Sequence, residues 1–224
     1  MARRIVVTSG KGGVGKTSIA ANLGIRLAKS GKRVCIMDAD FGLNNLDVVT
    51  GVEKLVVYDA ADCVEGRCRV KQALIECPSN KNVYILPSVH SIARTSINEK
   101  TIGELTEGLS TMFDYVVVDC PAGVNEGFSL AVSLSEEALV VTTPQLSSLR
   151  DADKVISLLR GYGLKSIRLI VNRVRGDLVA EGDMLSPEEI EKALKCHLAG
   201  VIPDDDNVFL RGAGLIPSDS PSFK

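Results

Sequence analysis

The sequence predicts an α/β fold of three layers, in which helices flank a doubly wound, mostly parallel sheet. Two observations predict it. Short aliphatic runs recur along the chain and are apolar at nearly every position, as expected of parallel strands buried on both faces. Segments with helical periodicity separate these runs, which is the alternation that a doubly wound sheet requires. The expected strands are residues 5–7, 34–37, 83–86, 115–118, 138–141, 169–171 and 199–202.

The helices between the strands have recognisable ends. Ile19, Leu23 and Leu27 fall on one face of the first helix, and Ser30-Gly31 is a typical stop signal. The segment from Ser186 to Glu189 predicts the start of a later helix, because a serine cap is followed by proline at the first helical position and by glutamate three residues after the cap.

The composition is typical of a soluble globular domain. The 224 residues are 45% hydrophobic and 24% charged, which excludes a disordered chain, a collagen and a small disulfide scaffold. A net charge of -2 favours no specific nucleic-acid partner. No two of the six cysteines have C-x-x-C spacing and no apolar run is long enough to span a membrane, so we expect reduced thiols in a cytoplasmic protein.

The most specific motif follows the first expected strand and precedes the first helix. It has the form G-x-x-x-x-G-K-T, in which glycines allow backbone N–H groups to surround a phosphate at a helix N-terminus. Lys16 is expected to reach the β- and γ-phosphates, and the Thr17 hydroxyl to bind Mg²⁺. A glycine-rich turn that merely starts a helix is the alternative. The predicted phosphate-binding residues are Gly10, Lys11, Gly12, Gly13, Val14, Gly15, Lys16, Thr17 and Ser18.

Carboxylates follow two of the expected strands, at the sheet edge where ligands bind. Asp38 suits the Mg²⁺ shell, and Asp119 has the position of a Walker B acid after four apolar residues. Asp40 is expected to act on the attacking water, either by orienting it or as a base. Any one of them could instead cap a helix or form a turn, but two such strand ends beside a phosphate loop favour a shared site for metal and water.

Lys11 is a second lysine in the loop. Because it is poorly placed to reach the phosphate that Lys16 holds, it can neutralise charge on a nucleotide bound by a neighbouring subunit, whereas the alternative is a solvated loop lysine. The run K-G-G-V-G-K-T resembles the deviant Walker A loop of the MinD/ParA ATPases, whose signature lysine crosses a dimer interface. We therefore predict Lys11, Lys16 and Asp40 as the catalytic residues.

The resemblance extends to residues 38–47, 64–69, 119–123, 142–144, 150–153 and 171–173. It implies a slow, partner-stimulated ATPase that uses ATP and Mg²⁺, dimerises when ATP is bound and acts in placing the division septum. It also implies that the division inhibitor MinC and the regulator MinE dock on one surface helix. The residues that match family positions are Asn45 and Gly123 in the switches, Asn172, Pro203 and Asp205 around the base, and Ser147, Arg150, Asp151 and Asp153 on the docking surface.

The domain organisation is expected to be one ATPase domain over residues 1–210 and an irregular tail over residues 211–224. Members of the family continue through a final helix and a short basic amphipathic helix that lies on the membrane surface. Residues 211–224 match neither helix. We therefore expect peripheral binding to the inner face of the cell membrane only if a targeting helix follows Lys224.

Four other functions remain open. Relatives that set flagellar number share the D-A-D-x-G-L-x-N run, although residues 65–68 and 125–127 favour septum placement. Chromosome partitioning would need a broad cationic face for DNA. An iron–sulfur carrier would need bridging thiolates, and Cys120-Pro121-Ala122-Gly123 has no second cysteine. The fourth alternative is an adaptor that binds nucleotide without hydrolysing it.

Overall fold

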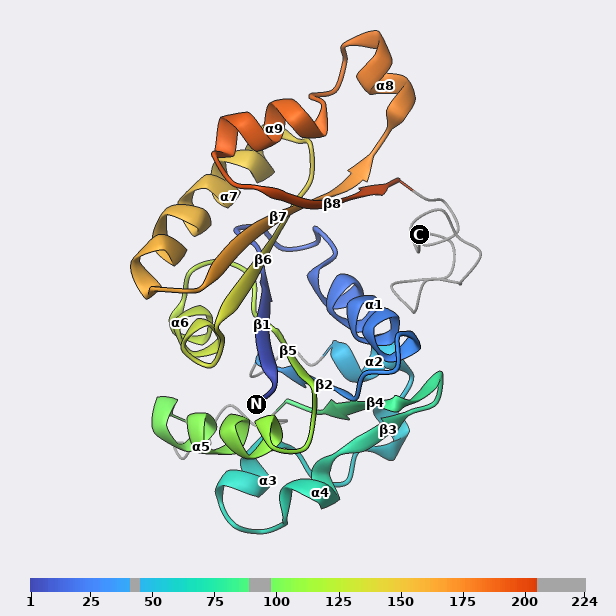
Figure 1. Cartoon of the computed structure of the whole chain (residues 1–224), viewed down its shortest axis with the longest axis vertical. Coiled ribbons are helices and arrows are strands. Elements are labelled where there is room, and N and C mark those ends of the chain that lie inside the picture. Colours follow the sequence, from blue (N-terminus) through green and yellow to red (C-terminus); the bar gives the residue numbers. More distant parts are fainter. Residues whose placement is uncertain (41–44, 89–97, 205–224) are drawn as a thin grey trace.

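The computed structural model describes residues 1–40, 45–88 and 98–204 of the chain (Figure 1). Asp205 and the predicted tail over residues 211–224 lie outside the described residues. The strands form one sheet in the order β3-β4-β2-β5-β1-β6-β7-β8. Their bounds are β1 Arg3–Thr8, β2 Val34–Asp38, β3 Ile75–Cys77, β4 Asn80–Leu86, β5 Tyr115–Asp119, β6 Glu137–Thr142, β7 Ser166–Val174 and β8 Leu198–Pro203.

The helices connect these strands, together with two short 3₁₀ turns, η1 Glu53–Leu55 and η2 Arg160–Tyr162. The described helices are α1 Lys16–Lys29, α2 Leu46–Thr50, α3 Ala60–Val64, α4 Val70–Ala73, α5 Glu99–Ser110, α6 Glu126–Ser133, α7 Leu146–Leu159, α8 Gly176–Glu181 and α9 Pro187–Leu194.

All seven predicted strands are present and are parallel to one another. The eighth strand, β3, runs antiparallel to β4 at one edge of the sheet, with Ile75 opposite Ile85. It carries no aliphatic run, because an edge strand of three residues needs only partial burial on one face. The predicted three-layer, mostly parallel architecture is therefore confirmed, with one short antiparallel strand added to it.

Two hydrophobic layers cover the two faces of the sheet. On one face α1 and α2 pack over β1, β2, β4 and β5, and on the other α3, α5, α6, α7 and α9 cover the strands (Figure 1). Ile19 and Ile25 of α1 are buried, whereas the expected Leu23 and Leu27 are half-buried at the rim. The side of α1 that faces the sheet includes Gly24. A Cβ at this position would lie 2.6 Å from Cδ1 of Ile36, so the absence of a side chain lets α1 pack closely on β2.

The helix ends follow the predicted signals. Helix α1 stops at Lys29, with Ser30 as its C-cap and Gly31 in the left-handed region at φ 85°. Helix α9 begins with the expected capping box, in which the Ser186 hydroxyl accepts from the amide of Glu189 and the Glu189 carboxylate accepts from the amide of Ser186.

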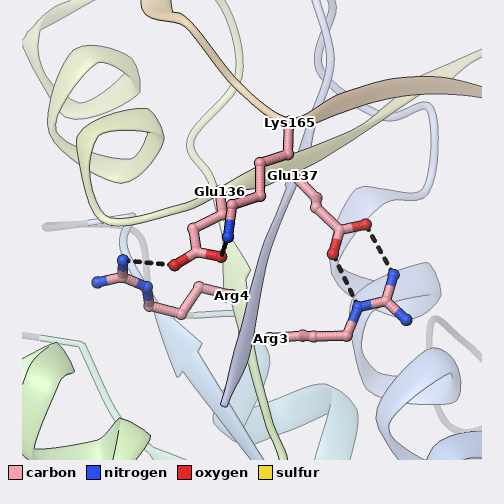
Figure 2. A network of polar contacts seen from close by, with 5 residues as sticks. All are labelled: Arg3, Arg4, Glu136, Glu137 and Lys165. Atoms are coloured by element: carbon pink, nitrogen blue, oxygen red, sulfur yellow. Dashed lines mark hydrogen bonds and ion pairs between the residues drawn. The ribbon is translucent and has the colours of Figure 1, made fainter. Parts of the chain in front are cut away.

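Ion pairs hold the amino ends of three neighbouring strands together (Figure 2). Arg3 forms two hydrogen bonds to Glu137, at 2.8 and 2.7 Å, and Glu136 accepts from both Arg4 at 2.9 Å and Lys165 at 2.6 Å. Lys165 and Arg4 lower the pKa of Glu136, and Arg3 lowers the pKa of Glu137. These charges align β1, β6 and β7 at the edge opposite to their carboxyl ends.

Within the described ranges, every helix is too short or too polar to cross a lipid bilayer.

Candidate functional site

The glycine-rich loop between β1 and α1 is held in a tight, backbone-rich turn. Gly13 and Gly15 have φ values of 77° and 98°, which favour glycine over any residue with a side chain. The Ser9 hydroxyl donates to the carbonyl of Lys11 at 2.8 Å, and the amide of Gly123 donates to the carbonyl of Ser9 at 3.2 Å. The loop therefore presents its amides at the N-terminus of α1, where a phosphate is favoured.

Asp38 and Asp119 end two adjacent strands and face each other in register. Their residues are 1% and 3% exposed, and Oδ2 of Asp38 and Oδ1 of Asp119 have no hydrogen-bond partner in the described part of the chain. Burial, and then the charge of Asp119, raises the pKa of Asp38 well above its usual range. Burial also raises the pKa of Asp119 to about 6, although the Thr17 hydroxyl and Lys16 lower it. Such buried carboxylate oxygens call for a cation or a water.

These residues fit a magnesium ion that is bound together with nucleotide. Two carboxylates and the Thr17 hydroxyl provide hard oxygen donors, which Mg²⁺ prefers. Within the described residues no group of three or more Asp, Glu, His and Cys side chains forms a metal cage on its own. Mg²⁺ at nucleotide sites usually takes its remaining ligands from substrate phosphates and water.

Asp40 lies just past the end of β2, where the chain has turned. Its amide donates to Oδ1 of Asp38 at 2.8 Å, and its carbonyl accepts from the hydroxyl of Ser88 at 2.9 Å. Burial raises the pKa of the Asp40 carboxyl, while Lys16 lowers it. Asp40 remains half-buried at the sheet edge, and after burial its charge contributes to the raised pKa of Asp38 and of Asp119. From this place its carboxyl can orient a water.

Ser88 was not predicted from the sequence, although it is fully buried and contacts Asp40. A signal was present, since Ser88 follows β4 by two residues and β4 is the parallel neighbour of β2. Polar residues that follow adjacent parallel strands meet at one edge.

Asn172 on β7 supports the phosphate loop from the side. Its Nδ2 donates to the carbonyl of Val14 at 2.8 Å, and its Oδ1 accepts from the amide of Arg173 at 3.0 Å. A Cβ at Gly15 would lie 2.6 Å from the same Nδ2. A contact between Asn172 and the adenine base stays a prediction, and the structure adds a second role for this side chain in holding the loop.

Helix α7, the predicted docking helix, lies directly against the loop. The Lys11 ammonium donates to the hydroxyl of Ser147 at 3.0 Å. A Cβ at Gly10 would lie 2.3 Å from the carbonyl oxygen of Asp151, so the loop and the helix backbone are in close contact. The predicted docking helix is therefore seated directly on the glycine-rich loop.

The outer face of α7 carries charged side chains together with the exposed Leu146 and Leu158. Leu149, Ala152 and Ile156 are buried, whereas Arg150 and Asp153 are exposed. Asp151 is partly covered and pairs with Lys154 at 3.2 Å.

The remaining predicted residues lie on other elements. Asn45 is exposed at the start of α2, Gly123 has φ 84° in the turn after β5, and Pro203 ends β8 beside β7.

Comparison with known proteins shows which family shares this site. A family model described as "ParA: NUBPL iron-transfer P-loop NTPase" matches residues 1–207. The septum site-determining protein MinD of Bacillus subtilis is 46% identical over 210 residues, which cover 93% of this chain and 78% of that protein. MinD of Synechocystis is 45% identical over 94% of this chain and 79% of its own length. The chain belongs to the MinD family.

Solved structures of MinD proteins have the same fold. MinD in a MinC:MinD cell division complex from Aquifex aeolicus has a TM-score of 0.86 and 41% identity, covering 93% of this chain and 84% of its own. MinD of Pyrococcus horikoshii, solved with Mg-ADP, has a TM-score of 0.82 and 32% identity, covering 94% and 84%. The chain is accordingly a P-loop ATPase of septum placement, with nucleotide and Mg²⁺ as its ligands.

Proposed function

We propose that this MinD-family chain is a slow positional switch, in which ATP joins two subunits, the dimer recruits a division inhibitor, and hydrolysis releases both. The observation that carries the proposal is the contact between the phosphate loop and α7. Lys11 bonds Ser147 and Gly10 packs on Asp151, so a change at the nucleotide reaches the docking helix directly.

The hydrolytic roles follow from chemistry and placement. Lys16 neutralises charge on the β- and γ-phosphates, and Asp40 orients the attacking water. Thr17, Asp38 and Asp119 hold Mg²⁺, which when bound neutralises charge on the phosphate oxygens. Because phosphoryl transfer depends mainly on positioning and charge neutralisation, a half-buried water-orienting carboxylate is adequate.

A slow rate in the single subunit is supported by the position of Lys11. Its ammonium is engaged by Ser147 on the rim of the loop. In the dimer each Lys11 leaves this contact and acts on the nucleotide of the partner subunit, as an arginine finger does in trans. Dimerisation and a regulator such as MinE then raise the rate.

The docking surface consists of Ser147, Arg150, Asp151 and Asp153. The inhibitor is proposed to be MinC or its functional equivalent, because the MinD of Aquifex aeolicus, 41% identical to this chain, forms a MinC:MinD complex. The exposed charges of Arg150 and Asp153 are suited to set the specificity of such a contact. MinE is proposed to use the same face.

The test separates hydrolysis, dimerisation and docking. Asp40→Ala should abolish phosphate release while ATP-dependent dimerisation, followed by light scattering, survives and becomes long-lived. Lys11→Ala should abolish the dimer. The double variant Arg150→Ala/Asp153→Ala should lose MinC binding but keep the ATP dimer, whereas Glu104→Ala on the exposed face of α5 should change nothing. Robust turnover by Asp40→Ala, an unchanged dimer fraction in Lys11→Ala, or unchanged MinC binding by the double variant would each contradict one assignment.

A further inference from the structure

The thiol of Cys63, at the end of α3, lies against the thiol of Cys68 in the loop that follows this helix. Their sulfur atoms are 3.5 Å apart, and neither cysteine is in a disulfide. The septum ATPase needs neither of them, since the site described above uses no residue of this turn. Two thiols in contact are therefore a feature that the proposed function leaves unexplained.

The backbone of the turn forces the two side chains together. Helix α3 ends at Val64, and Gly66 reverses the chain with a φ of 72°. The amides of Arg67 and Cys68 then both donate to the carbonyl of Asp62, at 2.9 and 3.3 Å. These two hydrogen bonds hold the segment that carries Cys68 against the end of α3, where Cys63 lies.

Side-chain contacts of Asp62 make this turn rigid. Its Oδ2 accepts from the amide of Asp59 at 3.0 Å while its own amide donates to Oδ1 of Asp59 at 2.9 Å, which is a complete capping box. The Arg67 guanidinium bridges Asp62, at 2.8 Å, and Glu65. Asp62 therefore holds both the start of α3, through Asp59, and the loop after it, through Arg67. These contacts fix the two thiols next to each other.

Access distinguishes this pair from the other cysteines. Cys63 and Cys68 are half-buried at the margin of the larger hydrophobic cluster, whereas Cys35, Cys77, Cys120 and Cys196 are buried. A small reagent can reach the pair from solvent without unfolding the core. To form a disulfide, the sulfur atoms must approach by about 1.5 Å, from 3.5 Å to a bond length of about 2.05 Å.

We propose that Cys63 and Cys68 are a reversible redox-modification site, at which a low-molecular-weight disulfide such as oxidised glutathione converts the two thiols into an intramolecular disulfide. The Cys68 thiolate attacks the reagent disulfide, forms a mixed disulfide and releases one thiolate, which takes up a proton. Cys63 then loses its proton and attacks Sγ of Cys68, which releases the second thiol. The protein loses two electrons and two protons, and the reagent gains both.

The order of the two attacks follows from the surroundings of Cys63. Burial raises the pKa of the Cys63 thiol to about 12, with additional contributions from Cys68, Asp62 and Asp59. Because a thiolate is the attacking species, Cys63 reacts second, and only when the mixed disulfide on Cys68 is already in contact with it. The reaction is therefore slow at neutral pH and accelerates as the pH rises.

The test uses the full chain, reduced and then equilibrated in glutathione buffers of increasing oxidised fraction. Alkylation with N-ethylmaleimide followed by intact mass should show the loss of two reactive thiols together. Peptide mapping should then find a Cys63–Cys68 crosslink. The crosslinked chain should melt on the order of 5 °C higher than the reduced chain. The bond restricts the unfolded chain, while the short loop that it closes keeps its native conformation. Reduction should reverse both changes.

Variants keep the test decisive. Cys63→Ser should give a single glutathione adduct on Cys68 and no crosslink, whereas Cys77→Ser, which removes a buried thiol elsewhere, should leave the crosslink unchanged. Circular dichroism of each variant verifies folding, and the wild-type crosslink map remains informative if one variant misfolds. The proposal is overturned by adducts without a crosslink in the wild type, by a crosslink at other cysteines or between chains, or by an unchanged melting temperature of the crosslinked chain.

Discussion

Asp38 and Asp119 face each other across adjacent parallel strands, each with one buried carboxylate oxygen that has no hydrogen-bond partner in the described residues. Nothing in ordinary strand packing requires two carboxylates at this place, and burial raises the pKa of both. The ligand-free protein therefore keeps two buried carboxyl groups in its core that hold their protons more tightly than free aspartates do. This is expected where a site is organised for a cation that arrives with its substrate.

Replacing Asp119 by Asn should stabilise the ligand-free protein at neutral pH. The pKa of Asp119 is raised from 3.8 to about 6, so the folded state holds this proton more tightly than the unfolded state does. Stability of the wild type therefore falls as the pH rises through this window and stays lower above it. Asp119→Asn should remove that fall and gain about 1–3 kcal/mol at pH 7, measured by urea unfolding between pH 4 and 8.

The same variant should lose the extra stability that Mg²⁺ and ADP confer on the wild type, because an amide is a weaker ligand for the ion. Asp153→Asn, at an exposed position of α7, is the control and should alter neither property. If the unfolding free energies of Asp119→Asn and the wild type changed with pH in the same way, the Asp119 carboxylate would not destabilise the ligand-free protein.

Ser88→Ala should lower kcat several-fold with little change in KM. The hydroxyl of Ser88 donates to the carbonyl of Asp40 at 2.9 Å, so its loss should loosen Asp40, the proposed water-orienting residue, without altering the phosphate loop. Ser110→Ala is a matched control, because it removes a similar buried bond, from the Ser110 hydroxyl to the carbonyl of Thr106 at 2.9 Å, in α5. Equal effects on kcat in the two variants would reduce Ser88 to a structural role.

Gly10→Ala should destabilise the ligand-free protein, whereas Gly12→Ala should not. The Cβ of an alanine at position 10 would lie 2.3 Å from the carbonyl oxygen of Asp151, and a backbone atom of a packed helix cannot yield cheaply. The expected cost is about 1–3 kcal/mol, the usual cost of overpacking. At position 12 the nearest atom is Cβ of Ala122, at 4.0 Å, which is ordinary contact. Thermal melts of both variants without nucleotide measure the difference, and equal melting temperatures would mean that α7 is not seated on the loop.

Asn172→Ala should weaken the binding of tripolyphosphate as well as that of ATP. The Asn172 amide bonds the carbonyl of Val14, so its removal loosens the phosphate loop and affects ligands that have no base. If Asn172 served the adenine alone, tripolyphosphate would bind the variant as tightly as the wild type. Isothermal titration with both ligands, each with Mg²⁺, distinguishes the two roles.

Much of the fold was accessible from local pattern. Most of the parallel strands are largely buried and apolar at nearly every position, and the half-exposed edge strand β8 keeps an apolar run, so all seven were predicted. The loop from Gly10 to Thr17 is recognisable because its function depends on consecutive residues. The edge strand Ile75–Cys77 was missed, because partial burial leaves no comparable pattern.

The sequence by itself determined the parallel α/β architecture and predicted the phosphate loop and the acids that serve it, because each depends on neighbours along the chain. Only the tertiary structure decided which distant side chains support them. Ser88 reaches Asp40, Asn172 reaches Val14, and Lys11 reaches Ser147, across separations of 48, 158 and 136 residues. Such contacts arise where the sheet brings the carboxyl ends of its strands to one edge, and hydrogen bonds between residues so far apart leave no periodic signal in the sequence.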